Sequence, residues 1–507
     1  MKNRKIIVIE LDGGSWNIIN PLIEEAKLPN IKRLIENGAS GQLISVLPAI
    51  SPKIWTSIFS GKKHHKTGID FFGGNSKMVK CKRVWDIFSE KGLKVGIFGS
   101  FVTWPPYRVK GFMIPAVDSL GTETYPSEYE FFQEIALNER KKIKRIRSKK
   151  IGFENLFYYA YKLKTNGVSN KTFLHTFNYF VQEKIRRFNQ KDKYWRKLIL
   201  HAKISTEFFI ALYRLYQPHF ANFHIHICDS TSHRYWAFYE PSKFDQVDRV
   251  LVKKYKDVIP NAYVKADESI GKILSQVDEH TTVIVASDHG FKALLGAIKP
   301  YDLNISRFLD VLGLRQKVVA ARFGPGLYLY FQHEELMNNI AGVLRNAELR
   351  EIDEKVFNVR LFEKILIVTK PNWRVDVSKI KEDSLIDFGK YGIYKFHDIF
   401  TPQETEMSGV HKKEGILILS GPNIKAGARI ENPSIYDITP TILTLMGYSV
   451  ARDMDGRVLT EALTDEFLSG NPVIYIDSYE NSFIEKSKLE EVDHKKIEER
   501  LESLGYL

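Results

Sequence analysis

Six residues of types that bind metal ions lie at the ends of short apolar runs of the chain: Asp12, Asp229, His233, Asp288, His289 and His411. Their carboxylate and imidazole groups suit Zn²⁺ or Mn²⁺, and six ligands exceed what one ion needs. Taken singly, an Asp after a strand is commonly a turn former or helix cap, and a lone His is commonly a hydrogen-bonded loop residue. Six together at strand ends instead predict a two-metal centre, with zinc favoured over manganese.

The apolar runs beside these residues predict the strands of an α/β domain. They are short, nearly continuous and rich in β-branched residues, and helix-length segments separate them; they cover 5–11, 93–98, 222–228, 281–286 and 415–419. Ligands of open α/β sheets bind at the carboxyl ends of the parallel strands. We therefore expect a mostly parallel sheet flanked by helices, with the six residues gathered at one edge.

Ser51 is a candidate nucleophile between the first two runs. A divalent cation can deprotonate a coordinated hydroxyl near neutral pH. Because Ser51 precedes Pro52, it should be extended, and 55–59 should begin a helix whose N-terminus directs amide dipoles toward a bound anion. Ser51 could instead serve only as the helix cap. The competing hydroxyls nearby are those of Ser45, Thr56 and Ser57.

The order of these residues resembles the alkaline phosphatase superfamily, and most closely its type I phosphodiesterase and nucleotide pyrophosphatase branch, with its predicted phosphohydrolase/phosphomutase proteins. The matching phrases are LPNI at 28–31, ISPKIWTS at 50–57, SDHG at 287–290, GILILSGP at 415–422, YDITPT at 436–441 and DMDGRVL at 453–459. The resemblance implies an alkaline-phosphatase-like fold. It also implies a metal-dependent phosphohydrolase acting on phosphomonoesters or phosphodiesters.

The resemblance further implies how the ligands divide between two ions. One ion would be held by Asp229, His233 and His411. The second would be held by Asp12, Asp288 and His289, with Ser51 on or beside it as the nucleophile. The implied partner is a phosphorylated substrate, which can be large and anionic, and the implied phosphoseryl intermediate is hydrolysed or passed to another hydroxyl.

Three positions depart from the pattern of the nucleotide pyrophosphatases. Phe72 stands where an Asn usually helps to hold the phosphoryl oxygen, and Thr67 stands where a His is usual. Pro52 has no N–H to offer an oxyanion. Lys53 could replace that electrostatic help, or it could be a surface lysine. These changes weaken the case for a nucleotide substrate more than they weaken the case for metal-assisted phosphoryl transfer.

Two enzymatic alternatives share the superfamily, a phosphomutase and a sulfatase-like hydrolase. The sulfatase motif places an Arg four residues after its nucleophile, which the sequence SPKIW at 51–55 does not supply. The alternative from another class is an anion- or membrane-binding protein with a decayed site. The complete set of six ligands argues against it, because a decayed site should have lost at least one.

The positive charge of the chain is concentrated in one segment. The formal charge of the chain is +13, yet 140–197 alone holds 18 Lys or Arg against three acids, so the remainder is nearly neutral. Twelve aromatic residues in this segment have helix-like spacing. We expect a helical insertion that borders the active-site entrance and contacts anionic substrate or an anionic membrane surface. A solvated basic face is the simpler alternative, and no specific nucleic-acid binding is predicted.

The apolar runs divide the chain into a discontinuous core and insertions. The predicted catalytic core is 1–118, 200–300 and 401–460, the basic insertion is 119–199, the cap is 301–400, and the C-terminal helical tail is 461–507. Leu489, Val492, Ile497 and Leu501 predict an amphipathic helix in the tail. Two cysteines cannot form a disulfide scaffold, and no apolar run reaches the roughly 18 residues that span a bilayer. We expect a cytoplasmic protein, peripheral to the membrane if it contacts one.

Overall fold

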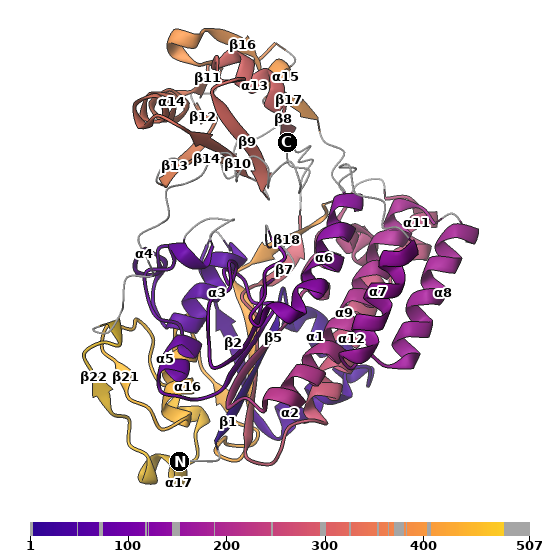
Figure 1. Cartoon of the computed structure of the whole chain (residues 1–507), viewed down its shortest axis with the longest axis vertical. Coiled ribbons are helices and arrows are strands. Elements are labelled where there is room, and N and C mark those ends of the chain that lie inside the picture. Colours follow the sequence, from indigo (N-terminus) through magenta and orange to yellow (C-terminus); the bar gives the residue numbers. More distant parts are fainter. Residues whose placement is uncertain are drawn as a thin grey trace. The chain divides into compact units, whose positions relative to one another are not determined.

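The computed structural model of the chain describes residues 4–47, 49–69, 75–116, 119, 121–143, 153–186, 188–244, 247–294, 301–323, 326–351, 354–362, 365–369, 380–381, 383–402 and 407–480. These residues belong to two compact units, both shown in Figure 1. The first unit lies within Met1–Arg140, Lys149–Leu294 and Met407–Lys486. The second lies within Lys141–Ser148, Leu295–Glu406 and Ser487–Leu507.

An eight-stranded sheet forms the centre of the first unit, in the order β20-β2-β19-β6-β1-β5-β3-β4 (Figure 1). The strands are β1 Lys5–Leu11, β2 Gly38–Ile44, β3 Val95–Phe98, β4 Gly111–Ile114, β5 Phe220–Ile225, β6 Thr281–Ala286, β19 Glu414–Ser420 and β20 Arg429–Ile430. The five neighbours from β6 to β4 are parallel. The prediction of a mostly parallel α/β sheet flanked by helices is therefore confirmed.

The prediction that 415–419 forms a parallel strand is wrong about the direction of the strand. It forms β19, which runs antiparallel to both β6 and β2. The chain reaches β19 from β18 (Gly409–Lys412), which pairs antiparallel with β7 (Gly290–Ala293), the strand that follows β6. The returning chain therefore meets β6 from the opposite direction. A continuous apolar run reports burial on both faces and carries no information on strand direction.

Helices cover both faces of the sheet. On one face, α1 (Trp16–Glu24), α2 (Pro29–Glu36), α9 (Gln190–Tyr216), α10 (Ile227–Tyr239) and α12 (Val258–Leu274) share an apolar core with alternate residues of β1. On the other, α3 (Ser51–Ser60), α5 (Val84–Glu90) and α16 (Ile438–Leu445) pack together. Every residue of α3 is buried, so this helix and the serine at its start are held rigidly in the core.

Two local boundaries differ from the sequence expectation. The run at 222–228 contains the end of β5 and the start of α10, because an apolar run does not distinguish a strand from a buried helical turn. Ser51 is the first residue of α3, and the extended residue is Ile50 with φ −118° and ψ 107°. Pro52 fits the first helical turn because the amides there have no intrahelical partner.

The segment that holds most of the positive charge is helical where the structure describes it. It contains the end of α6 (Glu130–Ile143), all of α7 (Phe153–Thr165) and α8 (Asn170–Arg186), and the start of α9, which continues to Tyr216. The helix α8 contacts both α7 and α9. No helix of the described residues is long and apolar enough to cross a membrane.

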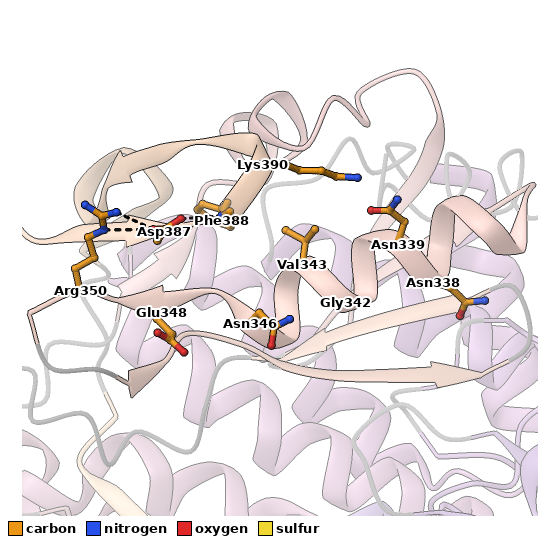
Figure 2. A pocket seen from close by; sticks show the side chains of 11 residues that line it. Asn338, Asn339, Gly342, Val343, Asn346, Glu348, Arg350, Asp387, Phe388 and Lys390 are labelled. Atoms are coloured by element: carbon orange, nitrogen blue, oxygen red, sulfur yellow. Dashed lines mark hydrogen bonds and ion pairs between the residues drawn. The ribbon is translucent and has the colours of Figure 1, made fainter.

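The second unit has its own core, built on two four-stranded sheets. One has the order β13-β14-β10-β9 and contains β10 (Gly326–Phe331), and the other has the order β12-β11-β15-β16. A pocket of about 770 Å³ beside α14 (Glu334–Asn346) is lined mostly by polar residues, together with Val343 and Phe388, and Arg350 is paired to Asp387 at 2.9 Å (Figure 2). None of the predicted site residues lines it. The helix expected at the end of the tail lies outside the described residues.

Candidate metal centre

The structure brings all six predicted ligands to the carboxyl edge of the parallel strands. Asp12 follows β1, and Asp288 and His289 follow β6. Asp229 and His233 lie one turn apart on α10, and His411 lies on β18. Their donor atoms converge in two groups, Asp229 with His233 and His411, and Asp12 with Asp288 and His289. The grouping is the division that the family resemblance implied.

The first group has the geometry of ligands around one ion. The Nε2 atoms of His233 and His411 are 2.9 Å apart, and they lie 3.4 and 3.3 Å from Oδ1 of Asp229. A tetrahedral zinc site with bonds of about 2.0–2.1 Å keeps its ligand atoms about 3.3 Å from one another. Three donors at these separations therefore leave room for a single ion between them.

The hydrogen bonds of the two imidazoles fix which nitrogen carries the proton. His233 Nδ1 lies 3.1 Å from the carbonyl oxygen of Gly409, and His411 Nδ1 lies 2.9 Å from that of Ala49. Because a carbonyl only accepts, each Nδ1–H is the donor, and the two Nε2 atoms face each other and Asp229. A proton on one Nε2 or a metal ion between them makes this 2.9 Å contact favourable, so the arrangement fits a cation site. Backbone partners of this kind also orient metal-bound imidazoles in proteins.

The second group is completely buried. His289 Nε2 lies 3.2 Å from Oδ2 of Asp288 and 3.6 Å from Oδ1 of Asp12, while its Nδ1 faces the carbonyl oxygen of Gly290 at 3.3 Å. These two carboxylate oxygens, together with Oδ1 of Asp229, are buried and find no hydrogen-bond donor among the described residues. Unpaired buried carboxylate oxygens are costly, and a bound cation removes that cost.

The protonation of this group fits a cation site. Burial and the charge of Asp12 raise the pKa of the Asp288 carboxyl well above its usual range. Burial, helped by the positive charge of His411, lowers the pKa of His289 to about 3. The neutral imidazole keeps a lone pair for coordination, and the crowded carboxylates need positive charge close by. Both donor groups therefore fit divalent metal ions.

Ser51 lies next to the second group. Its Oγ is 3.3 Å from His289 Nε2. Lys53, in the same helical turn, has only 3% of its surface exposed, so the alternative of a surface lysine is wrong. Thr67 is buried, with its hydroxyl bonded to the carbonyl of His64 at 3.1 Å. Phe72 lies outside the described residues.

Sequence reasoning missed a second layer behind Asp12. His224 on β5 bridges two carboxylates, with Nδ1 2.9 Å from Glu10 and Nε2 3.2 Å from Asp12. His226 adds a contact of 3.4 Å to Asp12. Burial lowers the pKa of His224, but its bonds to Asp12 and Glu10 outweigh burial and raise the pKa to about 10. The available signals were Glu10, which interrupts an apolar run, and two alternate histidines, His224 near the end of β5 and His226 just after it.

Replacing His224 with alanine is expected to weaken metal binding by about 10- to 100-fold, because Asp12 loses the group that orients it. His224→Gln retains one donor toward a carboxylate and should restore part of the affinity. Titration of metal-free protein with Zn²⁺ or Mn²⁺, with thermal unfolding measured alongside, tests this. Parental affinity in His224→Ala would show that Asp12 is oriented without it.

Comparison with known proteins identifies the family of the chain. The chain matches the type I phosphodiesterase / nucleotide pyrophosphatase family over residues 6–379, a range that includes Ser51 and every predicted ligand except His411. No curated protein matches the chain. The solved structure of human ectonucleotide pyrophosphatase / phosphodiesterase 5 matches with 11% identity and a TM-score of 0.44, covering 91% of this chain and 100% of that one. The family match spans well over half of the sequence, and the chain therefore belongs to the type I phosphodiesterase / nucleotide pyrophosphatase family of hydrolases that act on phosphoric ester bonds.

Proposed function

We propose that the chain hydrolyses phosphate esters with Ser51 as nucleophile and with two divalent metal ions, Zn²⁺ in preference to Mn²⁺. The observation that carries the proposal is the convergence of two donor groups beside one buried serine. Asp229, His233 and His411 would hold one ion, and Asp12, Asp288 and His289 the other. Bound there, the two ions would lower the pKa of the serine hydroxyl and neutralise the phosphoryl oxygens during in-line displacement.

The residues of the chain supply position and proton handling. Ser51 at the start of α3 is held by a buried helix whose amide dipoles favour an anion at that end. In the first step the Ser51 oxygen bonds to phosphorus while the bond to the leaving alcohol breaks. The hydroxyl proton ends on that alcohol. In the second step water attacks phosphoserine, which restores the serine and releases phosphate or a phosphomonoester.

Lys53 is proposed to assist this chemistry. It lies in the first turn of α3 with Ser51 and is buried, so its positive charge is little screened by water. Pro52, between the two residues, has no N–H to donate. An ammonium group in this turn would stabilise the charge that develops on the phosphoryl oxygens. The cytoplasmic location remains a prediction from the sequence.

A panel of three substrates tests the proposal. Protein supplied with Zn²⁺ or Mn²⁺ should hydrolyse p-nitrophenyl phosphate, bis-p-nitrophenyl phosphate, or both, and leave p-nitrophenyl sulfate nearly untouched. The ratio of the rates with p-nitrophenyl phosphate and bis-p-nitrophenyl phosphate shows whether the protein prefers monoesters or diesters. Faster turnover of the sulfate ester than of either phosphate would contradict the proposal. If none of the three substrates is hydrolysed with either metal, an anion- or membrane-binding protein with a decayed site would be the better account.

A further inference from the structure

Helix α8 presents an apolar stripe to solvent. The side chains of Leu174, Phe177 and Ile185 are 64%, 60% and 74% exposed, and Phe173 and Val181 are also exposed. At 100° per residue, these five positions fall within one sector of about 120° on the helix. Thr172 and Tyr179 are buried and lie on the opposite side. Helix α8 therefore carries a second apolar face, called here the α8 stripe, that is not packed against the described part of the chain.

The α8 stripe extends along most of the helix, and Lys184 is the one charged residue of α8 that falls within the same sector. From Phe173 to Ile185 it extends over about 18 Å. In Figure 1, α8 lies at the edge of the helical layer that it forms with α7 and α9. Single exposed apolar residues are common on proteins, but a contiguous row of aromatic and aliphatic side chains marks a contact surface.

Positive charge borders the α8 stripe. Lys171 and His175 lie between the stripe and the buried side of the helix, and Lys171 is exposed. Burial and the nearby charges of Lys203 and Lys265 lower the pKa of His175. Burial and Lys265 likewise lower the pKa of Lys203, with Lys171 adding to the effect. Glu268 and Glu207 pair with Lys265 and Lys272, so the excess positive charge beside the stripe comes from Lys171 and Lys203.

We propose that the α8 stripe is a docking surface for an anionic lipid bilayer. A helix with exposed aromatic and aliphatic side chains and bordering lysines can lie in the membrane interface, with the apolar groups among the acyl chains and the ammonium groups at the level of the phosphates. A second copy of the chain fits less well, because pairing two stripes would bring two positive borders together. The proposal does not depend on the phosphohydrolase activity.

Co-sedimentation with lipid vesicles tests the docking surface on the full chain. The parent should bind phosphatidylcholine vesicles that contain about 30% phosphatidylglycerol, and bind pure phosphatidylcholine more weakly. Raising the salt from about 0.05 M to about 0.5 M should weaken binding to the anionic vesicles, because the Debye length shortens. Failure of the parent to bind anionic vesicles at low salt would overturn the proposal.

A matched pair of double variants separates the α8 stripe from net charge. Leu174→Glu with Phe177→Glu should lower vesicle binding about tenfold or more, because two inserted side chains become charged. Leu215→Glu with Val250→Glu makes the same charge change at residues that are 69% and 74% exposed elsewhere, and should retain binding within about threefold of the parent. Both variants should keep the parental thermal unfolding and the turnover of a small phosphate ester.

Two outcomes would overturn the assignment of the α8 stripe to a membrane. Equal losses in the two double variants would show that net charge alone directs binding. A parent that sediments as a dimer, and that Leu174→Glu with Phe177→Glu converts to a monomer, would assign the stripe to a second copy of the chain.

Discussion

Replacing Ser51 with alanine is expected to lower turnover of a phosphate ester by about 10³-fold or more, while metal content and fold are retained. Its Oγ is 3.3 Å from His289 Nε2. Removing this oxygen removes the atom that forms the bond to phosphorus but leaves every proposed ligand in place. Initial rates of metal-loaded protein, with metal content measured on the same samples, test the expectation.

Ser57 provides the control within the same helix. It is as buried as Ser51, but it lies nearly two turns further along α3. Ser57→Ala should therefore change turnover by less than about threefold, since small buried substitutions away from the reacting atoms act mainly on stability. Near-parental turnover in Ser51→Ala would exclude covalent catalysis through this residue. Direct attack of water on the substrate would then be the better account.

The convergence of the six proposed ligands could be predicted because the sheet imposes it. Parallel strands end at a common edge, so residues that follow separate apolar runs become neighbours there. Asp229 and His233 show that this rule holds even when the predicted strand boundary is inexact. They lie on α10 and not at a strand end, but the first turns of a helix that follows a strand occupy the same edge. An error in the strand boundary therefore did not move these residues away from the site.

The layer behind the ligands could not be predicted because it depends on register. Glu10 and His224 are direct partners across the parallel pair β1 and β5, although 214 residues separate them in the chain. Asn222 and Ser100 also donate to the Glu10 carboxylate. Each residue read alone is a polar interruption of an apolar run. Only the pairing of the strands shows that these polar side chains hydrogen-bond to one another.

Removing the metal ions is expected to abolish hydrolysis and to destabilise the fold. Protein purified without chelator should contain about two ions per chain, and saturating EDTA should stop turnover until Zn²⁺ or Mn²⁺ is restored. The thermal midpoint should also fall, because the buried carboxylates of Asp12, Asp229 and Asp288 would then repel one another. Full activity in saturating EDTA would contradict the two-metal proposal.

A pair of buried aspartates distinguishes loss of a metal ligand from loss of a buried carboxylate. Asp288→Asn should lower both metal content and turnover, since the amide is a neutral and weaker ligand for a hard cation. Asp267 is also buried, but it accepts hydrogen bonds from the backbone amides of Asn30 and Ile31. Asp267→Asn should therefore lower the unfolding temperature and leave metal content unchanged. If both variants retained about two ions, Asp288 would not be a ligand, and the second site would have to be built from other donors.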